Sequence, residues 1–514
     1  MSTELIAKTF QGLEPLLAQE LTELGADDVQ IGRRMVSFKG DKELMYRANF
    51  CLRTAIRVLK PIKHFKARSA DDVYAQVKAI DWSKYLSPDN TFAVDSVVFS
   101  QEFHHSKFVA YKVKDAIADQ FREQCGRRPN VSVANPDIQL HIHIAEDDAT
   151  LALDSSGESL HRRGYRQETV AAPLNEVLAA AIIMMTGWNG QSDFLDPFCG
   201  SGTFCIEAAL IARGIAPGVF RTGYAFEKWA DFDPELLQQV YNDDSAERPF
   251  DHHIYGRDID PKAVALARRN VRAAGLSKDI TISEADFRTT PLLPLDIEAD
   301  SPLTTHSSQP PMIVTNPPYG ERVSSPDLLG LYKAIGQKLK HEHTGGEAWV
   351  LSYHEECFDE IGLKPSLKTP LYNGSLECEL RKYVLFSGKL DQHRATGGQL
   401  KTDDERRQMA EKRRFKQKRD SFRRNREDDD ADESSNQTAG QHRFNKYSKN
   451  DDFKGHKRPF RSRDEERDGD RGGDRDERYH RAPRRRDDYR QQGQTRSDRQ
   501  AARRRFFGGG DNKD

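Results

Sequence analysis

The stretch of residues 194–209, FLDPFCGSGTFCIEAA, constrains the fold more than any other part of the chain. It opens with an apolar pair that is typical of the end of a buried parallel strand, and Thr203–Ile211 is typical of a helix. Between them Gly200 and Gly202 indicate a tight turn. A strand, a glycine turn and a helix in this order place backbone N–H groups and the positive end of a helix beside a bound ligand.

The charge beside this turn indicates which ligand it accepts. Asp196 stands directly before the turn, and the G-x-G-x-x-G spacing of dinucleotide sites is absent because Phe204 and Cys205 follow Gly202. A carboxylate here would repel a pyrophosphate, whereas it suits a cationic ligand such as S-adenosylmethionine, with its sulfonium and amino group. An ordinary glycine-rich turn between a strand and a helix is the alternative that this stretch alone leaves open.

A second motif lies downstream in residues 312–322, MIVTNPPYGER. Pro317 and Pro318 fix φ and remove two N–H donors, so the turn is rigid and rich in acceptors. The Asn316 amide oxygen and a backbone carbonyl can accept from the exocyclic amine of a base, and Tyr319 offers a ring for stacking. Such an amine is a poor nucleophile. Positioning the amine against the methyl donor can lower the activation free energy by as much as ~7–11 kcal/mol, so that no strong base is needed. The alternative is that these residues form a turn without a catalytic role. The presence of the first motif in the same chain makes that alternative less favoured.

Together these motifs resemble a known family. The segments DPFCGSGTFCIEAALIARGIAPG, GRDIDPKAVALARRN, EADFR and NPPYGER resemble THUMP-domain class I RNA methyltransferases, above all those that methylate guanine N2 in large-subunit ribosomal RNA. The resemblance covers about residues 1–390. It implies an α/β, Rossmann-like methyltransferase domain with a mainly parallel sheet, preceded by ferredoxin-like and THUMP α+β domains. Larger members continue into a second methyltransferase domain, whose activity is not implied here because a charged tail follows instead.

The resemblance also implies S-adenosylmethionine as the cofactor. Asp258, at a strand end, is placed to accept from both ribose hydroxyls, and Asp260 is expected to cap the next helix. Asp286 is placed to accept from the adenine amine and Phe287 to flank its ring, with a plain turn carboxylate as the alternative for Asp286. The expected cofactor residues are Asp196, Cys199, Gly200, Gly202, Thr203, Asp258, Asp286 and Phe287. The gap from Gly202 to Asp258 far exceeds the roughly 20 residues of a simple unit, and family members carry a comparable insertion.

We expect four parts along the chain: a ferredoxin-like domain (1–60), a THUMP RNA-binding domain (61–157), the methyltransferase domain (158–390) and a disordered, Arg-rich tail (391–514). Two basic segments of the first two parts are candidates for RNA phosphate contacts. They are the hairpin turn Arg33–Arg34 and the helix expected over 107–124, for which a solvated turn and a solvated helix face are the alternatives. A further helix is expected to open at Pro173.

Charge separates the tail from the rest of the chain. Net charge is −2 overall, but residues 391–514 hold 36 Lys and Arg against 27 Asp and Glu. The tail is almost free of aliphatic residues and cannot bury enough apolar surface to order itself. Its interleaved aromatic and basic residues suit non-specific binding of single-stranded RNA, and a purely solubilising tail is the alternative.

Composition excludes several classes of protein. No charge-poor apolar run approaches 18 residues, and the N-terminus lacks a signal-peptide pattern, so we expect a cytoplasmic protein without a membrane partner. The six cysteines are scattered without a C-x-x-C pair, which argues against disulfides and zinc. The histidine pairs at 104–105 and 141–143 lack completing ligands, so no metal is expected.

The sequence therefore predicts an S-adenosylmethionine-dependent methyltransferase acting on guanine N2 of large-subunit (23S) ribosomal RNA. The expected catalytic residues are Asn316, Pro317, Pro318 and Tyr319, which would hold an unstacked base. One alternative is an adenine-N6 methyltransferase acting on DNA or RNA, because the tetrapeptide suits both amines. The adjoining residues 320–322 resemble the guanine-directed family. Another alternative is an RNA-binding ribosome assembly factor whose catalytic site is dispensable.

Overall fold

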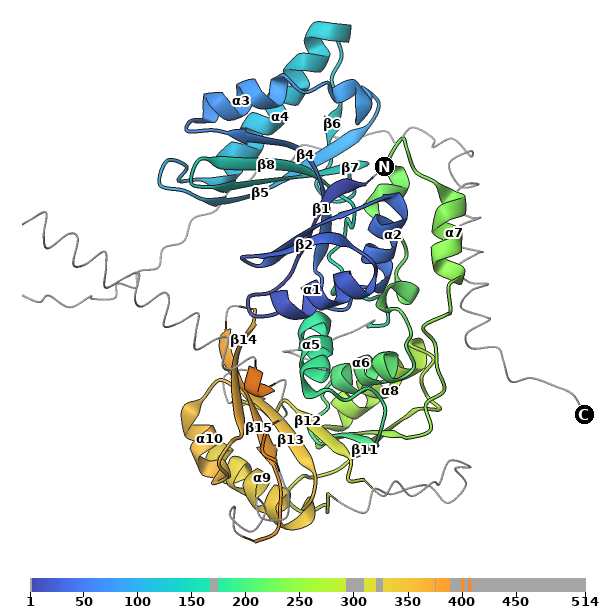
Figure 1. Ribbon diagram of the computed structural model, residues 1–514, viewed down its shortest axis with the longest axis vertical. Coiled ribbons are helices and arrows are strands. Elements are labelled where there is room, and N and C mark those ends of the chain that lie inside the picture. The colour runs from blue at the N-terminus through green and yellow to red at the C-terminus, as the bar shows by residue number, and fades with distance from the viewer. Residues whose placement is uncertain are drawn as a thin grey trace, which may run out of the picture. The chain divides into compact units, whose positions relative to one another are not determined.

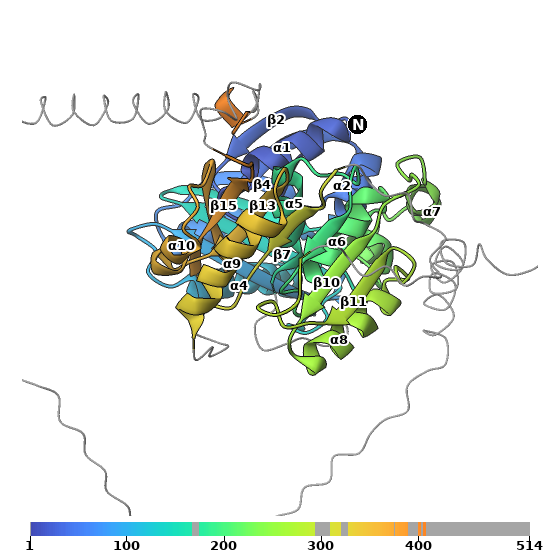
Figure 2. The same cartoon turned by 90° about the horizontal axis from the view of Figure 1, so that it is seen from below.

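The computed structural model describes residues 2–166, 174–292, 309–319, 327–374, 376–388, 399–401 and 405–407 of the chain. Nearly all of them belong to one compact unit that covers Met1–Leu400. Two sheets organise this unit, and the helices pack against them (Figures 1 and 2). Apart from residues 399–401 and 405–407, the Arg-rich tail that the sequence predicts lies outside the described residues.

The first sheet has eight strands in the order β2-β3-β1-β4-β8-β7-β5-β6. The strands are β1 (Thr3–Lys8), β2 (Asp27–Gly32), β3 (Met35–Gly40), β4 (Arg57–Lys66), β5 (Thr91–Phe99), β6 (Asn130–Val131), β7 (Ile138–Ala145) and β8 (Asp148–Asp154). Pairing is antiparallel except where β5 lies parallel to β6 and β7. The boundary expected between residues 60 and 61 falls inside β4, so the ferredoxin-like and THUMP parts share one continuous sheet.

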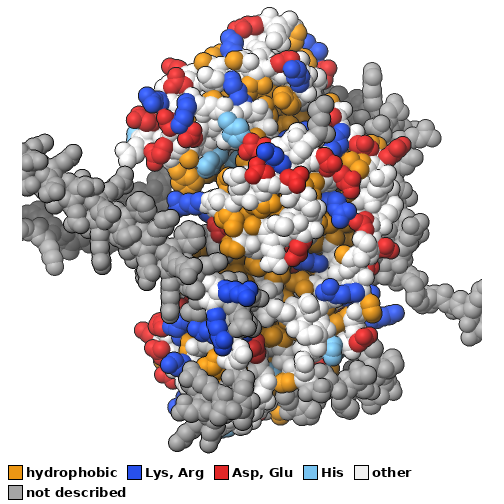
Figure 3. Space-filling model, in the orientation of Figure 1, with side chains coloured by type: hydrophobic (Ala, Val, Ile, Leu, Met, Phe, Trp, Pro, Cys, Tyr) orange, Lys and Arg blue, Asp and Glu red, His pale blue; other side chains and the backbone are white. Residues whose placement is uncertain are grey.

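The helices of this module are α1 (Glu14–Glu23), α2 (Lys42–Cys51), α3 (Ala70–Lys78) and α4 (Ser106–Cys125). Helices α2 and α3 begin where side chains satisfy free backbone N–H groups: Asp41 accepts from Leu44 N, and Ser69 forms a capping box. Apolar side chains of both layers share one core, which includes Leu140 and Ile142 of β7. The intervening histidines point to the other side of the sheet, and Figure 3 shows histidine side chains grouped on this module.

The second sheet has seven strands in the order β11-β10-β9-β12-β13-β15-β14. They are β9 (Phe194–Asp196), β10 (Ile254–Asp258), β11 (Ile280–Glu284), β12 (Met312–Thr315), β13 (Glu347–Ser352), β14 (Leu367–Asn373) and β15 (Leu376–Val384). The first five are parallel, and β15 and β14 close the sheet antiparallel. The mainly parallel sheet that ends in an antiparallel hairpin is thus confirmed.

The helices of the second module are α5 (Glu176–Thr186), α6 (Thr203–Ala212), α8 (Pro261–Ala273), α9 (Leu328–Glu342) and α10 (Glu355–Ile361). The prediction that α5 opens at Pro173 is wrong. The helix begins after Asn175, whose side chain accepts from Val177 N and Leu178 N at 3.0 and 3.4 Å. Asn175 satisfies two free N–H groups, which a proline cannot do, and this decides the start. Pro173 lies outside the described residues.

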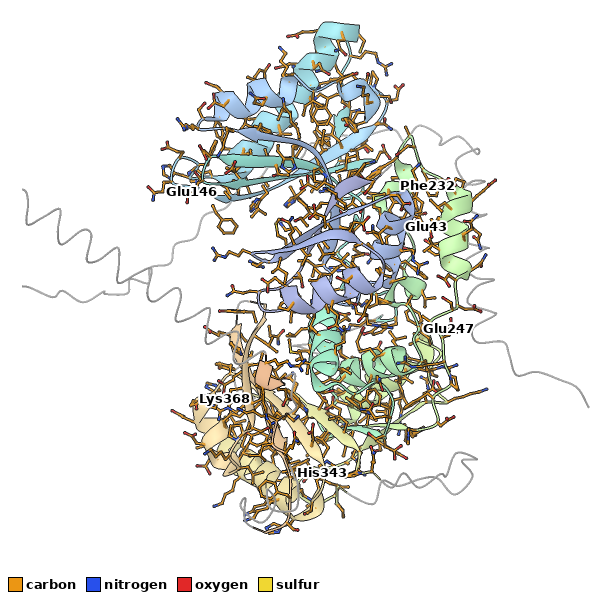
Figure 4. All side chains as sticks on the ribbon, viewed as in Figure 1. Glu43, Glu146, Phe232, Glu247, His343 and Lys368 are labelled. Atoms are coloured by element: carbon orange, nitrogen blue, oxygen red, sulfur yellow. The ribbon has the colours of Figure 1, made fainter. Side chains whose placement is uncertain are left out.

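The insertion between α6 and β10 packs back onto the first module. It contains α7 (Pro234–Asn242), which lies beside α2 in both ribbon views (Figures 1 and 2). The Phe226 ring stacks on Tyr46 with centroids 4.2 Å apart, and Asp243 accepts from Arg47 at 2.9 Å. Figure 4 labels Phe232 of the insertion and Glu43 of α2 in this region. The residues between the two cofactor motifs therefore form one of the contacts between the two modules.

Among the helices that the structure describes, none combines the length and the apolar character needed to cross a membrane. The described residues also contain no cluster of three or more His, Cys, Asp or Glu side chains that could hold a metal ion.

Candidate functional site

A buried carboxylate lies at the end of β9. Asp196 is 1% exposed, and one of its oxygens accepts from Thr315 Oγ1 at 2.7 Å and from Phe198 N at 3.1 Å. Burial raises the pKa of Asp196 to about 7, to which the charge of Asp258 also contributes, whereas the two hydrogen bonds act in the opposite direction. The site therefore holds a carboxyl that a nearby cation would ionise.

The glycines of the turn adopt left-handed backbone conformations. Gly200 has φ of 54° and Gly202 has φ of 82°, which other residues rarely adopt. A Cβ on Gly202 would lie 3.3 Å from the Cβ of Ala267, whereas a Cβ on Gly200 would meet no atom within 4 Å. Gly202 is thus needed for its backbone and for close packing on α8, and Gly200 borders open space that a ligand can fill.

A second carboxylate is tied to the same turn. Asp258 ends β10, and its two oxygens accept from Gly200 N and Asp260 N, each at 2.9 Å. Burial raises its pKa as well. Asp260 caps α8 by accepting from Lys262 N at 2.9 Å, which confirms its predicted structural role. Burial is the largest cause of the raised pKa of both Asp196 and Asp258. The turn thus carries one buried acid, Asp196, and one half-buried acid, Asp258.

The third pair of expected cofactor residues lies beyond β11. Asp286 Oδ1 accepts from Arg288 N at 2.9 Å, so it does act as a turn carboxylate, and its contact with an adenine stays a prediction. Phe287 is buried, and its ring lies 4.8 Å from that of Phe198 in the first turn. This ring contact brings the third strand end against the glycine turn. Lys338 Nζ lies 5.8 Å from the Phe287 ring centroid.

The Asn-Pro-Pro-Tyr turn follows β12. The Tyr319 hydroxyl donates to Asn316 Oδ1, the acceptor that the sequence assigns to a base amine. Burial raises the pKa of Tyr319 well above its ordinary value, so the hydroxyl stays protonated. The Tyr319 ring lies 5.3 Å from that of Tyr353 in an edge-to-face arrangement, and Pro317 is buried beside them. The expected residues 320–322 lie outside the described residues.

Parallel pairing brings the two turns together. Because β9 and β12 are neighbours, their carboxyl ends meet at one edge of the sheet, and the bond from Thr315 Oγ1 to Asp196 joins them. Two expected residues have other structural partners. Cys199 N donates to Arg257 O at 2.8 Å while its thiol is buried, and Thr203 Oγ1 accepts from Arg166 at 2.7 Å.

Sequence reasoning missed the residues that brace this turn from behind. Arg166 forms an ion pair with Glu176 at 3.3 Å as well as its bond to Thr203. Arg163, 2% exposed, donates to Arg53 O of the first module and contacts Glu207 of α6 at 3.5 Å. The dense basic segment SLHRRGYR was the available signal; its Arg163 is buried and its Arg166 half-buried, each with an internal partner, whereas Arg162 is exposed.

The strand order, the parallel core with its closing hairpin and the carboxylate-lined glycine turn define a class I methyltransferase. Comparison with known proteins narrows this class. Residues 163–382 match the family described as "RMKL-like, methyltransferase domain", residues 67–154 match the THUMP domain, and residues 4–59 match the RlmL ferredoxin-like domain. A Synechocystis protein whose name describes it as a candidate RNA methyltransferase is 39% identical over 391 residues, which are 74% of this chain and 96% of that protein.

The chain therefore belongs to the family of RlmK/L-like THUMP-domain RNA methyltransferases. The ribosomal RNA large subunit methyltransferases K/L of Syntrophotalea carbinolica and Vibrio campbellii are 39% and 36% identical to it. The matches cover 74% and 76% of this chain but only 53% and 54% of those proteins, so the chain spans about half their length.

Two solved structures share the fold across most of their length. The methyltransferase SMU.472, solved in complex with SAH, is 31% identical with a TM-score of 0.65, covering 76% of this chain and 99% of that one. A structure from Listeria monocytogenes, titled as a predicted N6-adenine-specific DNA methylase, is 30% identical with a TM-score of 0.64, covering 74% and 96%.

Proposed function

We propose that this protein transfers a methyl group from S-adenosylmethionine to the exocyclic N2 of a guanine in large-subunit (23S) ribosomal RNA. The observation that carries the proposal is the bond between Thr315 Oγ1 and Asp196, because it joins the acceptor turn to the donor turn at one sheet edge. The K/L relatives are named for ribosomal RNA, and the SMU.472 structure holds SAH. We also propose that the protein acts in the cytoplasm.

The donor turn fits the cofactor. S-adenosylmethionine supplies an electrophilic methyl group on a positive sulfonium. Asp196 is a buried acid and Asp258 a half-buried one, burial raises the pKa of both, and the space beside Gly200 admits a ligand. We assign the remaining turn residues, Cys199, Gly202 and Thr203, with Asp286 and Phe287, to the walls of this site.

The acceptor turn orients the amine. In the chain as described, Asn316 Oδ1 accepts from Tyr319, so a base amine would replace the tyrosine hydroxyl as the donor. Pro317 and Pro318 keep the turn rigid, and the Tyr319 ring is available for stacking on the base. No carboxylate or histidine would be required as a strong base. As the nitrogen bonds to the methyl carbon, the carbon–sulfonium bond would break, and the nitrogen, now acidic, would lose its proton to water.

The test is mass spectrometry of nucleosides from ribosomal RNA of cells that lack this gene. We expect N2-methylguanosine to disappear from large-subunit RNA and to return with the wild-type gene but not with Asn316→Ala. The purified variant should transfer methyl groups about a hundredfold more slowly than the wild type, because one preorganised contact is lost. The matched control is Asn242→Ala, an exposed asparagine at the end of α7, which should restore the modification fully.

Other outcomes would redirect the proposal. Loss of N6-methyladenosine would favour the adenine-N6 reading, which the Asn-Pro-Pro-Tyr turn and the name of the Listeria structure also suit. Full rescue of ribosome assembly by Asn316→Ala without any methylation would favour an assembly factor. No change in any nucleoside would exclude ribosomal RNA as the substrate.

A further inference from the structure

One face of the eight-stranded sheet points away from the helices and carries basic and aromatic side chains. On β7, Leu140 and Ile142 belong to the core, so His141 and His143 lie on the opposite face. Lys8 Nζ of β1 lies 3.1 Å from His141 Nε2, and the His143 ring lies 6.0 Å from that of Phe99. These contacts place Lys8 and Phe99 on this face. Phe99 is 53% exposed although it is a large aromatic.

Positive charge is concentrated here at a cost to folding. Lys8 and Arg57 stand directly opposite each other in the β1–β4 pair, an arrangement in which like charges repel. Arg57 is balanced by Asp154, but Lys8 faces a neutral imidazole, because burial and the nearby cations lower the pKa of His141 to about 3. Burial, Arg34 and Arg57 together lower the pKa of Lys8 to about 8, although Asp154 and Asp95 act in the opposite direction. Glu4 is occupied by His64 at 2.9 Å.

The turn between β2 and β3 adds two more cations. Arg33 and Arg34 form its two central positions, where Asn-Gly is the favoured pair. Arg34 has φ of 58°, a left-handed conformation that arginine adopts only under strain. The Arg33 guanidinium lies 5.9 Å from the centroid of the Phe99 ring, so the hairpin of one domain reaches the end of β5 in the other. Among the described residues, neither arginine side chain forms an ion pair with an acid.

Helix α4 is the rival surface, and its charges are arranged differently. It exposes Phe108 and Tyr111, each with a lysine over its ring at 5.7 Å. However, the lysines have acidic partners: Lys112 pairs with Asp71 at 3.0 Å, and Lys114 with Asp115 at 2.8 Å. Lys112 and Lys114 of α4 are thus neutralised locally, whereas Arg33 and Arg34 form no ion pair among the described residues. A polyanion is attracted by the surplus charge.

We propose that Lys8, Arg33, Arg34 and Phe99, which we call the Arg33–Phe99 surface, hold an unpaired segment of the RNA substrate. Backbone phosphates contact Lys8 and Arg34, and one base stacks on the exposed ring of Phe99 beside the Arg33 guanidinium. Binding relieves the repulsion that the free protein carries, because phosphate stabilises the charged form of Lys8. The proposal rests on the proposed RNA substrate and selects the sheet face over α4 as its docking surface.

The test uses the full chain and a transcript of 23S ribosomal RNA that contains 4-thiouridine. Ultraviolet cross-linking followed by peptide mass spectrometry should place a cross-link on the peptide that contains Phe99. Affinity is measured with a fluorescent hairpin RNA that ends in a single-stranded tail. Phe99→Ala should weaken binding about tenfold through lost stacking. Arg34→Gly should weaken it severalfold and reduce the slope of log K against log salt by about 1.

The Arg34→Gly variant also distinguishes an effect on RNA affinity from an effect on the stability of the fold. Glycine suits a φ of 58°, so the thermal midpoint should stay unchanged or rise while RNA affinity falls. The matched control is the double variant Lys112→Ala/Lys114→Ala on α4, which should bind RNA within twofold of the wild type. Wild-type affinity in both Phe99→Ala and Arg34→Gly, or a loss of affinity confined to the α4 variant, would overturn the proposal.

Methyl transfer to the same transcript is measured in parallel. If the wild type cross-links through Phe99 but transfers no methyl group, the surface stands and the proposed reaction fails. If the transcript is methylated at the wild-type rate by the Phe99→Ala and Arg34→Gly variants under limiting RNA, the reaction stands and the surface fails.

Discussion

The two sheets of this protein arrange charge in opposite ways. The seven-stranded sheet holds the buried Asp196 and the half-buried Asp258 at the carboxyl ends of its strands, whereas the eight-stranded sheet carries the half-buried Lys8 and the exposed Arg33 and Arg34. Burial strengthens each interaction, so two carboxylates suffice to favour a small cationic ligand. Exposed cations are screened by water and salt, so a polyanion has to be attracted by several at once. In this protein, the sign of the charge on each sheet indicates the opposite charge of its ligand. The burial of that charge indicates whether the ligand is a small molecule or a polymer.

The largest expected effect concerns the joint between the two sheets. Arg163 is buried between the modules, and Arg163→Met should lower the free energy of unfolding by about 3–5 kcal/mol, because Glu207 would keep a buried charge without its partner. Arg162→Met is the matched control: Arg162 is exposed, pairs only with Glu158 among the described residues, and should change stability by no more than about 0.5 kcal/mol. Urea unfolding measures both. Equal midpoints would mean that the two sheets are joined elsewhere.

The next effect concerns the buried acid of the donor turn. A carboxyl in an unfolded chain has a pKa near 4, whereas the pKa of Asp196 in the folded protein is about 7. The folded state therefore binds the proton more tightly. The contribution of this proton to stability is complete below pH 4 and is lost as the pH rises to 7. A cationic cofactor favours the ionised form, so its affinity should rise about tenfold per unit from pH 5 to 7 and then level off. Calorimetry in buffers of different ionisation enthalpy would detect the released proton. In Asp196→Asn, the affinity should be weak and nearly independent of pH.

A smaller effect separates Asp258 from its neighbour Asp260. Asp258→Ala should weaken cofactor binding about tenfold, because a charge-assisted hydrogen bond is lost, and leave RNA binding intact. Asp260→Ala should lower stability by about 1 kcal/mol through the lost helix cap while cofactor affinity stays the same. If calorimetry shows the same cofactor affinity for Asp258→Ala and the wild type, Asp258 does not belong to the cofactor site.

The smallest effect concerns the basic tail, and it sharpens the account of the open sheet face. Deleting residues 391–514 should reduce the salt dependence of RNA binding, since fewer counterions are displaced, without changing cofactor affinity. The measurement is the slope of log K against log salt for both chains. An unchanged slope would leave the tail as a solubilising segment and the described unit as the RNA-binding part.

Much of the fold could be predicted because its signals are local. The strand before Asp196, the helix after Gly202 and the cap at Asp260 follow from residues next to one another, and the structure confirms all three. The start of α5 was misplaced because a proline and an asparagine two residues apart both suit a helix start. Only the position of the backbone N–H groups shows that Asn175 satisfies them.

The methyltransferase class could be predicted from the amino-acid sequence because the glycine turn and the Asn-Pro-Pro-Tyr turn, with the segments around them, resemble a known family. Which basic residues form internal contacts and which stay open to a ligand could be seen only in the folded chain. Arg163 is buried between the modules and Arg166 is half-buried against Glu176, whereas Arg33 and Arg34 remain exposed. The physical reason is that an arginine's role depends on its desolvation and on partners far away in the chain. Arg163, for instance, contacts Arg53 O and Glu207, which come from two different modules.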